Sequence, residues 1–298
     1  MRFIGLFFCL TKVSLSSTIK TVMRLFIGLI VLCSYSDKLA YTIFSSTGKK
    51  TDFAELVKEA SKADVVVFGE IHNVSIAHWL ELQLVKKLYT IKGNNLMLGA
   101  EMLEADDQLA VNEYLHKSFE YSTFKNEVKL WNNFGTDYKP LLDFARENSL
   151  LFIATNAPRR YSGIVYNYGI DSLGTIAPEA KNWLAPLPIY IDTTLTSYKE
   201  MAEASGHTGT NLVAAQALKD ATMAYFINKN YIKDGLFIHF NGSYHNEAII
   251  NYFKKFNPGL KILSISCVEQ EQLESLEKEN KEIADYIIAI PTDMAKSY

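Results

Sequence analysis

The feature that most constrains this chain is an apolar run followed directly by polar, reactive residues. Residues 65–68 are Val-Val-Val-Phe, and Gly69 ends the run. A continuous apolar run of this kind indicates a strand buried on both faces, as in a parallel sheet. Glu70 and His72 come next, so the strand would carry a carboxylate and an imidazole to its carboxyl end. In open α/β sheets, ligands bind at this end.

Similar apolar runs recur along the chain and alternate with helical patterns. This alternation predicts a mostly parallel central sheet with helices on both faces, a three-layer α/β/α fold. We expect an extended lead-in at residues 37–50 and a charged, exposed helix between the last two strands. The further strands are expected at residues 96–102, 150–156, 236–245, 261–268 and 284–290.

The middle of the chain departs from this alternation. Residues 157–210 contain four of the seven prolines, many tyrosines and only short helical patterns. Long irregular segments inside compact domains tend to be functional. We therefore predict a single domain over residues 37–298 that carries a helical and irregular lid at about residues 157–210.

The first 36 residues have the pattern of a targeting leader. They hold four basic residues and no acidic one, with an apolar run at residues 25–32 and a small-x-small cleavage signal at residues 34–36. The apolar run is too short to span a bilayer. Cys33 offers lipidation as an alternative, although Leu32 replaces the small residue that usually precedes a lipidated cysteine. Both alternatives predict an exported protein, in the periplasm or associated with the outer membrane.

Charge and cysteine content exclude some classes of function. The chain has a net charge of -3, and its body is more acidic still because the leader holds only basic groups. An acidic body without a basic stripe argues against nucleic-acid binding. Cys267 is the one cysteine beyond the leader, so an internal disulfide is excluded and a buried, inert thiol is expected.

Four of the predicted strands end in polar residues. Because the carboxyl ends of parallel strands lie at the same edge of the sheet, we expect these residues to converge. Two Gly-x-x-His endings stand out, at residues 69–72 and 242–245. The strand-end candidates are Glu70, His72, Glu101, Asn156 with Arg159, Asn241 and His245.

Three residues on predicted helices could join this group. His78 falls in the first turn of the helix after the first strand. Gln216 and Asp220 lie one turn apart on a later helix, and Asp220 stands among alanines, so we expect it to face a polar group such as a crevice histidine. His239, within a buried strand, is expected to be a core residue.

The candidate residues are consistent with three kinds of site. A histidine oriented by a carboxylate can act as a general base on water. Histidines and carboxylates together can bind a divalent metal. The group can also be a hydrogen-bonded network that only closes the sheet end. The sequence lacks the Gly-x-Ser-x-Gly nucleophile motif, a Walker loop, Gly-x-Gly-x-x-Gly and His-Glu-x-x-His.

The order of these motifs resembles the ChaN-type haem-binding lipoproteins, over roughly residues 50–290. The wider superfamily includes the Tiki/TraB proteins and the erythromycin esterases. The residues that carry the resemblance are Gly69-Glu-Ile-His72 with His78, Glu101-Met102, Trp131 with Tyr138-Lys-Pro140, Asn156-Ala-Pro-Arg159, Gln216-Ala-Leu-Lys-Asp220 with Met223-Ala224, and Gly242-Ser-Tyr-His245.

The resemblance implies an α/β/α protein of iron acquisition, often membrane-anchored, that binds haem with tyrosine and histidine ligands from a mobile region across a dimer. In this chain the corresponding ligands would be Tyr198 and His207. A TonB-type haem receptor system would then be a partner. No covalent haem-attachment motif is present, so haem would be held non-covalently.

The same resemblance implies a second, competing function. In the hydrolytic members of the superfamily the first Gly-x-x-His histidine looks like a base that glutamates orient, with or without a metal. Carried over, His72 would be the base, Glu70 and Glu101 its supports, and His245 a partner. A third hypothesis is an interaction domain whose inherited site is idle.

Overall fold

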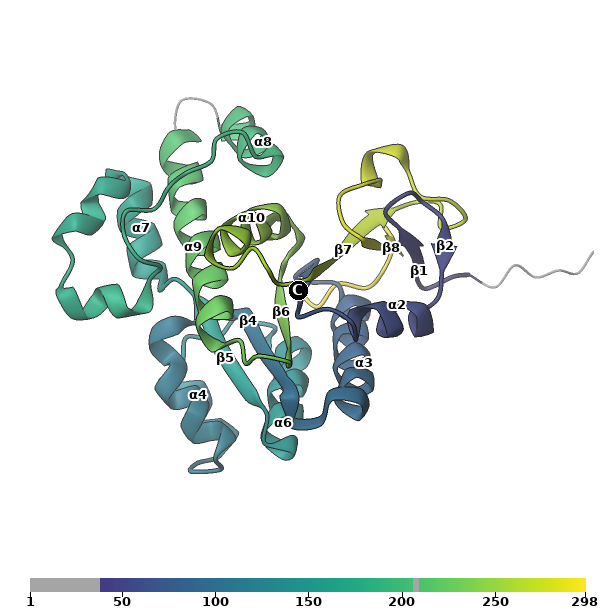
Figure 1. Ribbon diagram of the computed structural model, residues 1–298, viewed down its shortest axis with the longest axis horizontal. Coiled ribbons are helices and arrows are strands. Elements are labelled where there is room, and N and C mark those ends of the chain that lie inside the picture. Colours follow the sequence, from purple (N-terminus) through teal and green to yellow (C-terminus); the bar gives the residue numbers. More distant parts are fainter. Residues whose placement is uncertain (1–37, 206–208) are drawn as a thin grey trace, which may run out of the picture. The chain divides into compact units, whose positions relative to one another are not determined.

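The centre of the protein is an eight-stranded, mostly parallel sheet (Figure 1). The computed structural model describes residues 38–205 and 209–298, and residues 40–298 form one compact unit. The strand order is β2-β1-β8-β7-β3-β6-β4-β5, with every pair parallel from β8 to β5. The strands are β1 (Thr42–Ser45), β2 (Lys50–Thr51), β3 (Val65–Glu70), β4 (Leu96–Glu104), β5 (Leu151–Asn156), β6 (Leu236–Gly242), β7 (Ile262–Gln270) and β8 (Tyr286–Pro291).

Helices cover both faces of this sheet, as the alternation of apolar runs predicts. On β3, Val66 and Phe68 belong to one hydrophobic core, and Val65 and Val67 belong to the other. The first core is completed by α2 (Phe53–Ala60), α3 (Ser75–Lys92), α4 (Gln108–Leu115), α5 (Tyr121–Glu127) and α6 (Lys139–Asn148), and the second by α9 (Gly209–Asn230) and α10 (Asn246–Phe256). The expected three-layer α/β/α fold is confirmed.

The expected extended lead-in includes β1, which pairs antiparallel with both β2 and β8. Another local expectation is wrong. The charged helix expected between the last two strands is a loop with only a short 3₁₀ turn, Lys278–Asn280. Its form follows from its contacts: the Gln270 amide donates to the carbonyl of Ser275 (2.8 Å), and Leu273 is buried against Phe44.

The segment predicted as a lid consists of two helices joined by short turns. It contains α7 (Arg159–Tyr168), two 3₁₀ segments and α8 (Thr196–Ser205). Both helices contact α9 (Figure 1), and the segment shares a small core around Val165 and Leu184 with Leu218 of α9. Its role as a lid, and the domain limits proposed from sequence, stay predictions.

The leader predicted at residues 1–36 lies outside the described residues. Within residues 38–205 and 209–298, none of the helices combines the length and apolarity that a membrane span requires. Cys267 is buried in the first core, as expected, and burial raises the pKa of its thiol well above the usual value.

Candidate functional site

The two Gly-x-x-His endings lie against each other at the carboxyl edge of the sheet. On the paired strands β3 and β6, Gly69 lies opposite Asn241 and Glu70 lies opposite Gly242, and each glycine permits a close approach. A Cβ on Gly69 would lie 2.5 Å from the Asn246 amide, and one on Gly242 would lie 2.6 Å from Nε2 of His72. The motif therefore requires glycine because any side chain would displace the neighbouring motif.

Glu70 orients His72. Oε1 of Glu70 lies 2.7 Å from Nδ1 of His72 and accepts a hydrogen bond from the Tyr138 hydroxyl at 2.6 Å. The His72 ring also packs edge-on against Trp131, with ring centroids 4.8 Å apart. The Glu70 carboxylate is fully buried, whereas the His72 side chain is 34% exposed. His72 is thus the accessible end of a buried carboxylate–imidazole pair.

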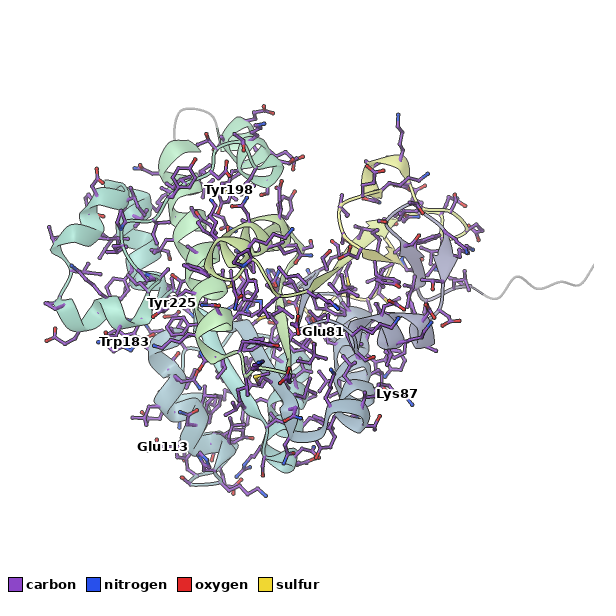
Figure 2. The ribbon with its side chains drawn as sticks, viewed as in Figure 1. Glu81, Lys87, Glu113, Trp183, Tyr198 and Tyr225 are labelled. Atoms are coloured by element: carbon purple, nitrogen blue, oxygen red, sulfur yellow. The ribbon has the colours of Figure 1, made fainter. Side chains whose placement is uncertain are left out.

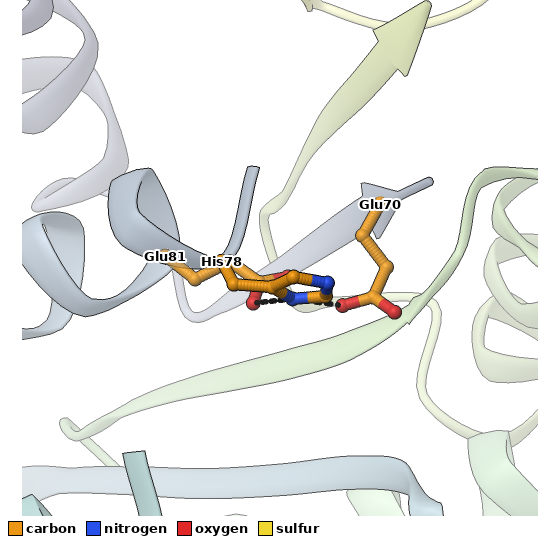
Figure 3. Close-up of side chains that lie close together, drawn as sticks. All are labelled: Glu70, His78 and Glu81. Carbon is orange, nitrogen blue, oxygen red and sulfur yellow. Dashed lines mark hydrogen bonds and ion pairs between the residues drawn. The ribbon is translucent and has the colours of Figure 1, made fainter. Parts of the chain in front are cut away.

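A second histidine approaches Glu70 from α3 (Figure 3). Nδ1 of His78 lies 3.3 Å from Oε2 of Glu70 and 3.2 Å from Oε2 of Glu81. Its Nε2 faces the backbone carbonyl of His72 at 3.2 Å and a carboxylate oxygen of Asp137 at 3.6 Å. His78 is therefore surrounded by acceptors on both ring nitrogens.

The pKa values of this group diverge because the charges are buried together. Burial alone would raise the pKa of Glu70, but hydrogen bonds from His72 and His78 lower it to about 2. Burial opposes the charged form of His78, yet Glu70 and Glu81 raise its pKa to about 11. Burial and the neighbouring Glu70 charge raise the pKa of Glu81 well above its usual value. At neutral pH, Glu70 is ionised and His78 is cationic, and Glu81 is the carboxylate of the two that takes up a proton more readily.

A second carboxylate–histidine group is centred on His245, in the short 3₁₀ turn Ser243–His245 after β6. Its Nε2 lies 3.1 Å from Oε1 of Glu101, and its Nδ1 is hydrogen-bonded to Asp220 of α9. Gln216, one turn before Asp220, contacts the same ring at 2.9 Å. The sequence-based expectation that Asp220 faces a crevice histidine is met in this arrangement.

The protonation of this second group follows from the same physics. Burial disfavours the imidazolium, but Glu101 and Asp220 raise the pKa of His245 to about 10. Burial opposes ionisation of Glu101, and the His245 charge nevertheless holds its pKa far below the usual range. His245 is accordingly a buried cation between two carboxylates at neutral pH.

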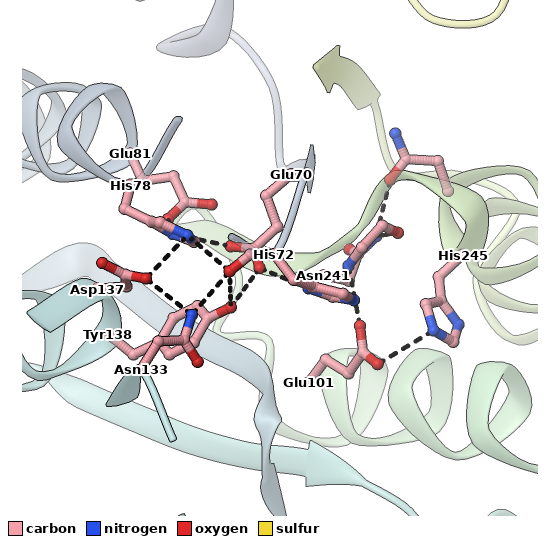
Figure 4. A network of polar contacts seen from close by, with 12 residues as sticks. Glu70, His72, His78, Glu81, Glu101, Asn133, Asp137, Tyr138, Asn241 and His245 are labelled. Carbon is pink, nitrogen blue, oxygen red and sulfur yellow. Dashed lines mark hydrogen bonds and ion pairs between the residues drawn. The ribbon is translucent and has the colours of Figure 1, made fainter. Parts of the chain in front are cut away.

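The two groups meet at His72 and Glu101 (Figure 4). Oε2 of Glu101 accepts a hydrogen bond from the backbone N–H of Gly242 at 2.9 Å, and Gly242 is the residue against which the His72 ring lies. The β4–β5 register shifts between Ala100 and Glu104. A bulge of this kind re-aims side chains at a strand end, and Glu101 lies beside Gly242 and His245.

A buried polar ladder supports the site from below. Nε2 of His239 lies 2.7 Å from the Thr155 hydroxyl, and its Nδ1 lies 2.9 Å from the Asn241 amide oxygen. Asn241 in turn donates to Asn246 at 2.8 Å, and Asn246 donates to the Ile265 carbonyl. Burial lowers the pKa of His239 to about 4, so the ring is neutral. His239 is the satisfied core residue that its place in a strand predicts.

Comparison with known proteins assigns the family. The family model described as haem-binding uptake, Tiki superfamily, ChaN matches residues 56–252, a range that includes both Gly-x-x-His endings. The chain belongs to the ChaN family. A search of curated proteins gives no match.

Comparison with solved structures shows one fold similarity with a TM-score above 0.5 among the three described here. The structure of ChaN from Campylobacter jejuni, which shows cofacial haem binding, has a TM-score of 0.63 at 18% identity and covers 83% of this chain and 96% of its own. An erythromycin esterase variant in its open conformation has a TM-score of 0.46 at 11% identity and covers 76% of this chain and 77% of its own. A Bacillus cereus protein has a TM-score of 0.46 at 12% identity and covers 80% and 90%.

Of the two haem ligands that the ChaN resemblance implies, the structure describes Tyr198. Tyr198 lies on α8 with its ring buried, and its hydroxyl donates to Asp220 at 2.7 Å (Figure 2). Burial and the Asp220 charge raise the pKa of Tyr198, which opposes the phenolate that would bind ferric iron. His207 lies outside the described residues. In this conformation Tyr198 does not fit a haem ligand, and its role stays a prediction that requires α8 to move.

Two other candidates lie at the rim of the site. Arg159 is hydrogen-bonded to Glu104 and, with Trp131, lines a cavity of about 310 Å³. Asn156 is buried at the end of β5, and its side-chain oxygen has no hydrogen-bond partner among the described residues. Their place among the site residues stays a prediction.

Four residues around His78 belong to the site but were not predicted from the sequence. Glu81 is the clearest omission, since it is a fully buried glutamate on the apolar side of α3, three residues after His78. A carboxylate at a position where the helical pattern predicts an apolar residue could have identified Glu81 as a site residue. The other three come from the aromatic loop before α6 and are Asn133, Asp137 and Tyr138.

Proposed function

We propose that this protein binds haem non-covalently and serves haem or iron acquisition at the cell envelope. The observation that carries the proposal is membership of the ChaN family over residues 56–252. The fold similarity to Campylobacter jejuni ChaN, whose structure shows cofacial haem binding, supports the same function. Export through the leader at residues 1–36, a lipid anchor, a homodimer and delivery from a TonB-type receptor are parts of this proposal.

The buried position of Tyr198 makes a second tyrosine relevant. Tyr244 is exposed, precedes His245, and lines a cavity of about 490 Å³ together with Ser197 and Glu200 of α8. Tyr198 can bind haem iron only if its hydrogen bond to Asp220 breaks and α8 moves. Tyr244 could bind haem iron with α8 in its present position. Variants of the two tyrosines therefore separate a mobile from a docked haem site.

Titration of the purified chain with haemin tests the proposal. We expect a saturable shift of the Soret band in the wild-type protein and weaker binding in His207→Ala. Tyr198→Phe weakens binding if α8 is released, and Tyr244→Phe weakens it if α8 stays docked. His116→Ala, at an exposed histidine that follows α4, serves as the matched control. Absence of any saturable shift in the wild-type protein contradicts the function.

A hydrolase is the second candidate function, and the Glu70–His72 pair favours it. Because Glu70 accepts the Nδ1 proton of His72, the tautomer leaves Nε2 as the base. This nitrogen lies on the partly exposed side chain, beside Gly242 and the Glu101 carboxylate. A water molecule at the crevice could transfer its proton to Nε2, and the Glu70 carboxylate would stabilise the resulting imidazolium.

Turnover of a panel of small esters by the haem-free protein tests this second function. We expect any activity found to fall roughly 100-fold or more in His72→Gln, since general-base catalysis contributes about 10²–10⁴. His116→Gln, at an exposed histidine, is the matched control. Full activity of His72→Gln would exclude His72 as the base.

A further inference from the structure

The Glu70–His78–Glu81 cluster has features that hydrogen bonding alone does not explain. The two separations from Nδ1 of His78, 3.3 Å and 3.2 Å, are long for charge-assisted hydrogen bonds, which usually measure about 2.7–2.9 Å. The neighbouring contact from Glu70 to His72, at 2.7 Å, has the ordinary length. The three side chains thus face one another at distances longer than those of charge-assisted hydrogen bonds.

The cluster also contains buried oxygen atoms that lack partners. Among the described residues, Oε2 of Glu70 and Oε1 of Glu81 are inaccessible to solvent and accept no hydrogen bond. Both carboxylates belong to side chains with no exposed surface. An unsatisfied carboxylate oxygen in the interior is strongly unfavourable. In the metal-free chain, the His78 imidazolium compensates the Glu70 charge from 3.3 Å, whereas a metal ion between the side chains would contact the carboxylates directly.

We propose that Glu70, His78 and Glu81 form a binding site for a single first-row divalent transition metal ion, such as Zn²⁺. One ligand atom from each residue lies within 4.8 Å of the others (Figure 3). Bonds of 2.0–2.1 Å to a tetrahedral ion place ligand atoms about 3.3 Å apart, which is the separation of Nδ1 from each carboxylate. Two carboxylates and a neutral imidazole balance a charge of +2, so binding of the ion would release the Nδ1 proton of the His78 imidazolium.

The surrounding contacts are those that orient metal ligands. A metal-binding histidine usually donates its other ring N–H to a carbonyl or carboxylate. Nε2 of His78 faces the His72 carbonyl at 3.2 Å and Asp137 at 3.6 Å, and Asn133 donates to both of these acceptors (Figure 4). The remaining oxygen of Glu70 is fixed by the Tyr138 hydroxyl.

The donor set selects the kind of ion. Imidazole suits Zn²⁺ and other transition metals, whereas Mg²⁺ and Ca²⁺ prefer oxygen ligands and keep more of them. The site is distinct from any haem site on α8, because its ligands come from β3 and α3. Glu70 would bind the ion through Oε2 and contacts His72 through Oε1. A single side chain would therefore connect the ion to the accessible imidazole of His72.

Metal binding to the tag-free, haem-free chain tests the proposal. After treatment with a chelator, the protein is titrated with Zn²⁺ and separately with Co²⁺, and bound metal is measured by elemental analysis. We expect one equivalent per chain, a rise in Tm on Zn²⁺ addition, and visible Co²⁺ absorption bands of a low-coordinate site. Mg²⁺ is expected to leave Tm unchanged.

Two ligand variants and one control locate the ion. Glu81→Gln and His78→Gln should each weaken Zn²⁺ binding at least tenfold and abolish the Co²⁺ bands, with folding checked by circular dichroism. Glu113→Gln, at an exposed position on α4, should bind as the wild type does. Failure of wild-type protein to bind Zn²⁺ overturns the proposal, as does binding that survives Glu81→Gln but is lost in Glu101→Gln. If one ligand variant does not fold, the other decides.

Discussion

At the residue scale, the site depends on charges that are buried and mutually compensated. His245 lies between Glu101 and Asp220, and all three side chains are buried. Removing one member of a buried ion pair leaves the others uncompensated and costs about 3–5 kcal/mol. The arrangement is therefore sensitive both to substitution and to pH.

We predict that His245 makes stability fall as pH rises above neutrality. Its pKa is about 10 in the folded protein, against about 6.5 for an unfolded histidine. The stabilisation is thus fully present below about pH 6.5 and is lost as pH rises towards 10. Urea unfolding between pH 6 and 10 should show that His245→Gln is much less stable near neutrality and that the gap narrows at alkaline pH.

His116→Gln is the control for this experiment, because His116 is exposed. It should reproduce the wild-type pH dependence. A gap between wild type and His245→Gln that stays constant from pH 6 to 10 contradicts a cationic His245.

We predict that the motif glycines are required for steric reasons. In Gly69→Ala the new Cβ would lie 2.5 Å from the Asn246 amide and 2.8 Å from the Cα of Ser243, and the latter is backbone that cannot turn aside. Overpacking of this kind costs about 1–3 kcal/mol, measured by urea unfolding. Gly163→Ala on α7 meets nothing within 4 Å and should stabilise by about 0.5–1 kcal/mol. Equal stability of the two variants contradicts the steric argument.

The sequence predicted most strand-end residues of the site because parallel strands bring their carboxyl ends together. Asp220 was also predictable, since a carboxylate among alanines needs a polar partner. Glu81, Asp137 and the Tyr198–Asp220 contact were not identified. These depend on how α3, residues 131–138 and α8 pack against the sheet. The angles at which such elements pack produce no periodic pattern in the sequence.

At the element scale, strands and long helices were predictable where apolar periodicity was strong, as in β3 and α9. The loop between β7 and β8 was not, because its charged composition resembles that of an exposed helix. Its shape comes from one buried amide, Gln270, which holds the turn through backbone groups. Tertiary hydrogen bonds of this kind override local helix propensity.

We predict that Glu247 holds α8 in its docked position. Its carboxylate accepts hydrogen bonds from the backbone N–H groups of Thr196 (3.0 Å) and Ser197 (2.9 Å), at the amino end of the helix. An acceptor at this end satisfies free N–H groups and is favoured by the helix dipole. In Glu247→Gln, hydrogen exchange of α8 should accelerate, by about 5- to 30-fold for a loss of 1–2 kcal/mol.

Glu200→Gln, at an exposed position on α8, should leave this exchange unchanged. The same variants also bear on the haem site. If Tyr198 is a ligand, Glu247→Gln should speed haemin binding because α8 is released more often. Unchanged exchange in Glu247→Gln would show that Tyr198 and the apolar contacts with α9 hold α8 by themselves.

At the scale of the whole molecule, the two candidate sites lie on different elements. The carboxyl edge of the sheet carries the Glu70–His72 and Glu101–His245 pairs, whereas Tyr198, a haem ligand that the family resemblance implies, lies on α8. The hydrogen bond from Tyr198 to Asp220 joins the two, since Asp220 also contacts His245. A ligand that moves α8 would therefore alter the environment of His245.

Export is the last prediction, and it belongs to the chain as a whole. Residues 1–36 combine basic residues, a short apolar run and small residues around Cys33, and the acidic body that follows carries the whole described fold. We expect the full chain to leave the cytoplasm of a bacterial host and a chain lacking residues 1–36 to stay there, as shown by cell fractionation. Cys33→Ala separates the two kinds of leader: it moves the protein from membrane to soluble fractions if Cys33 is lipidated and changes nothing if the leader is cleaved. Retention of the full chain in the cytoplasm contradicts an envelope role, because haem capture from outside requires the protein to be there.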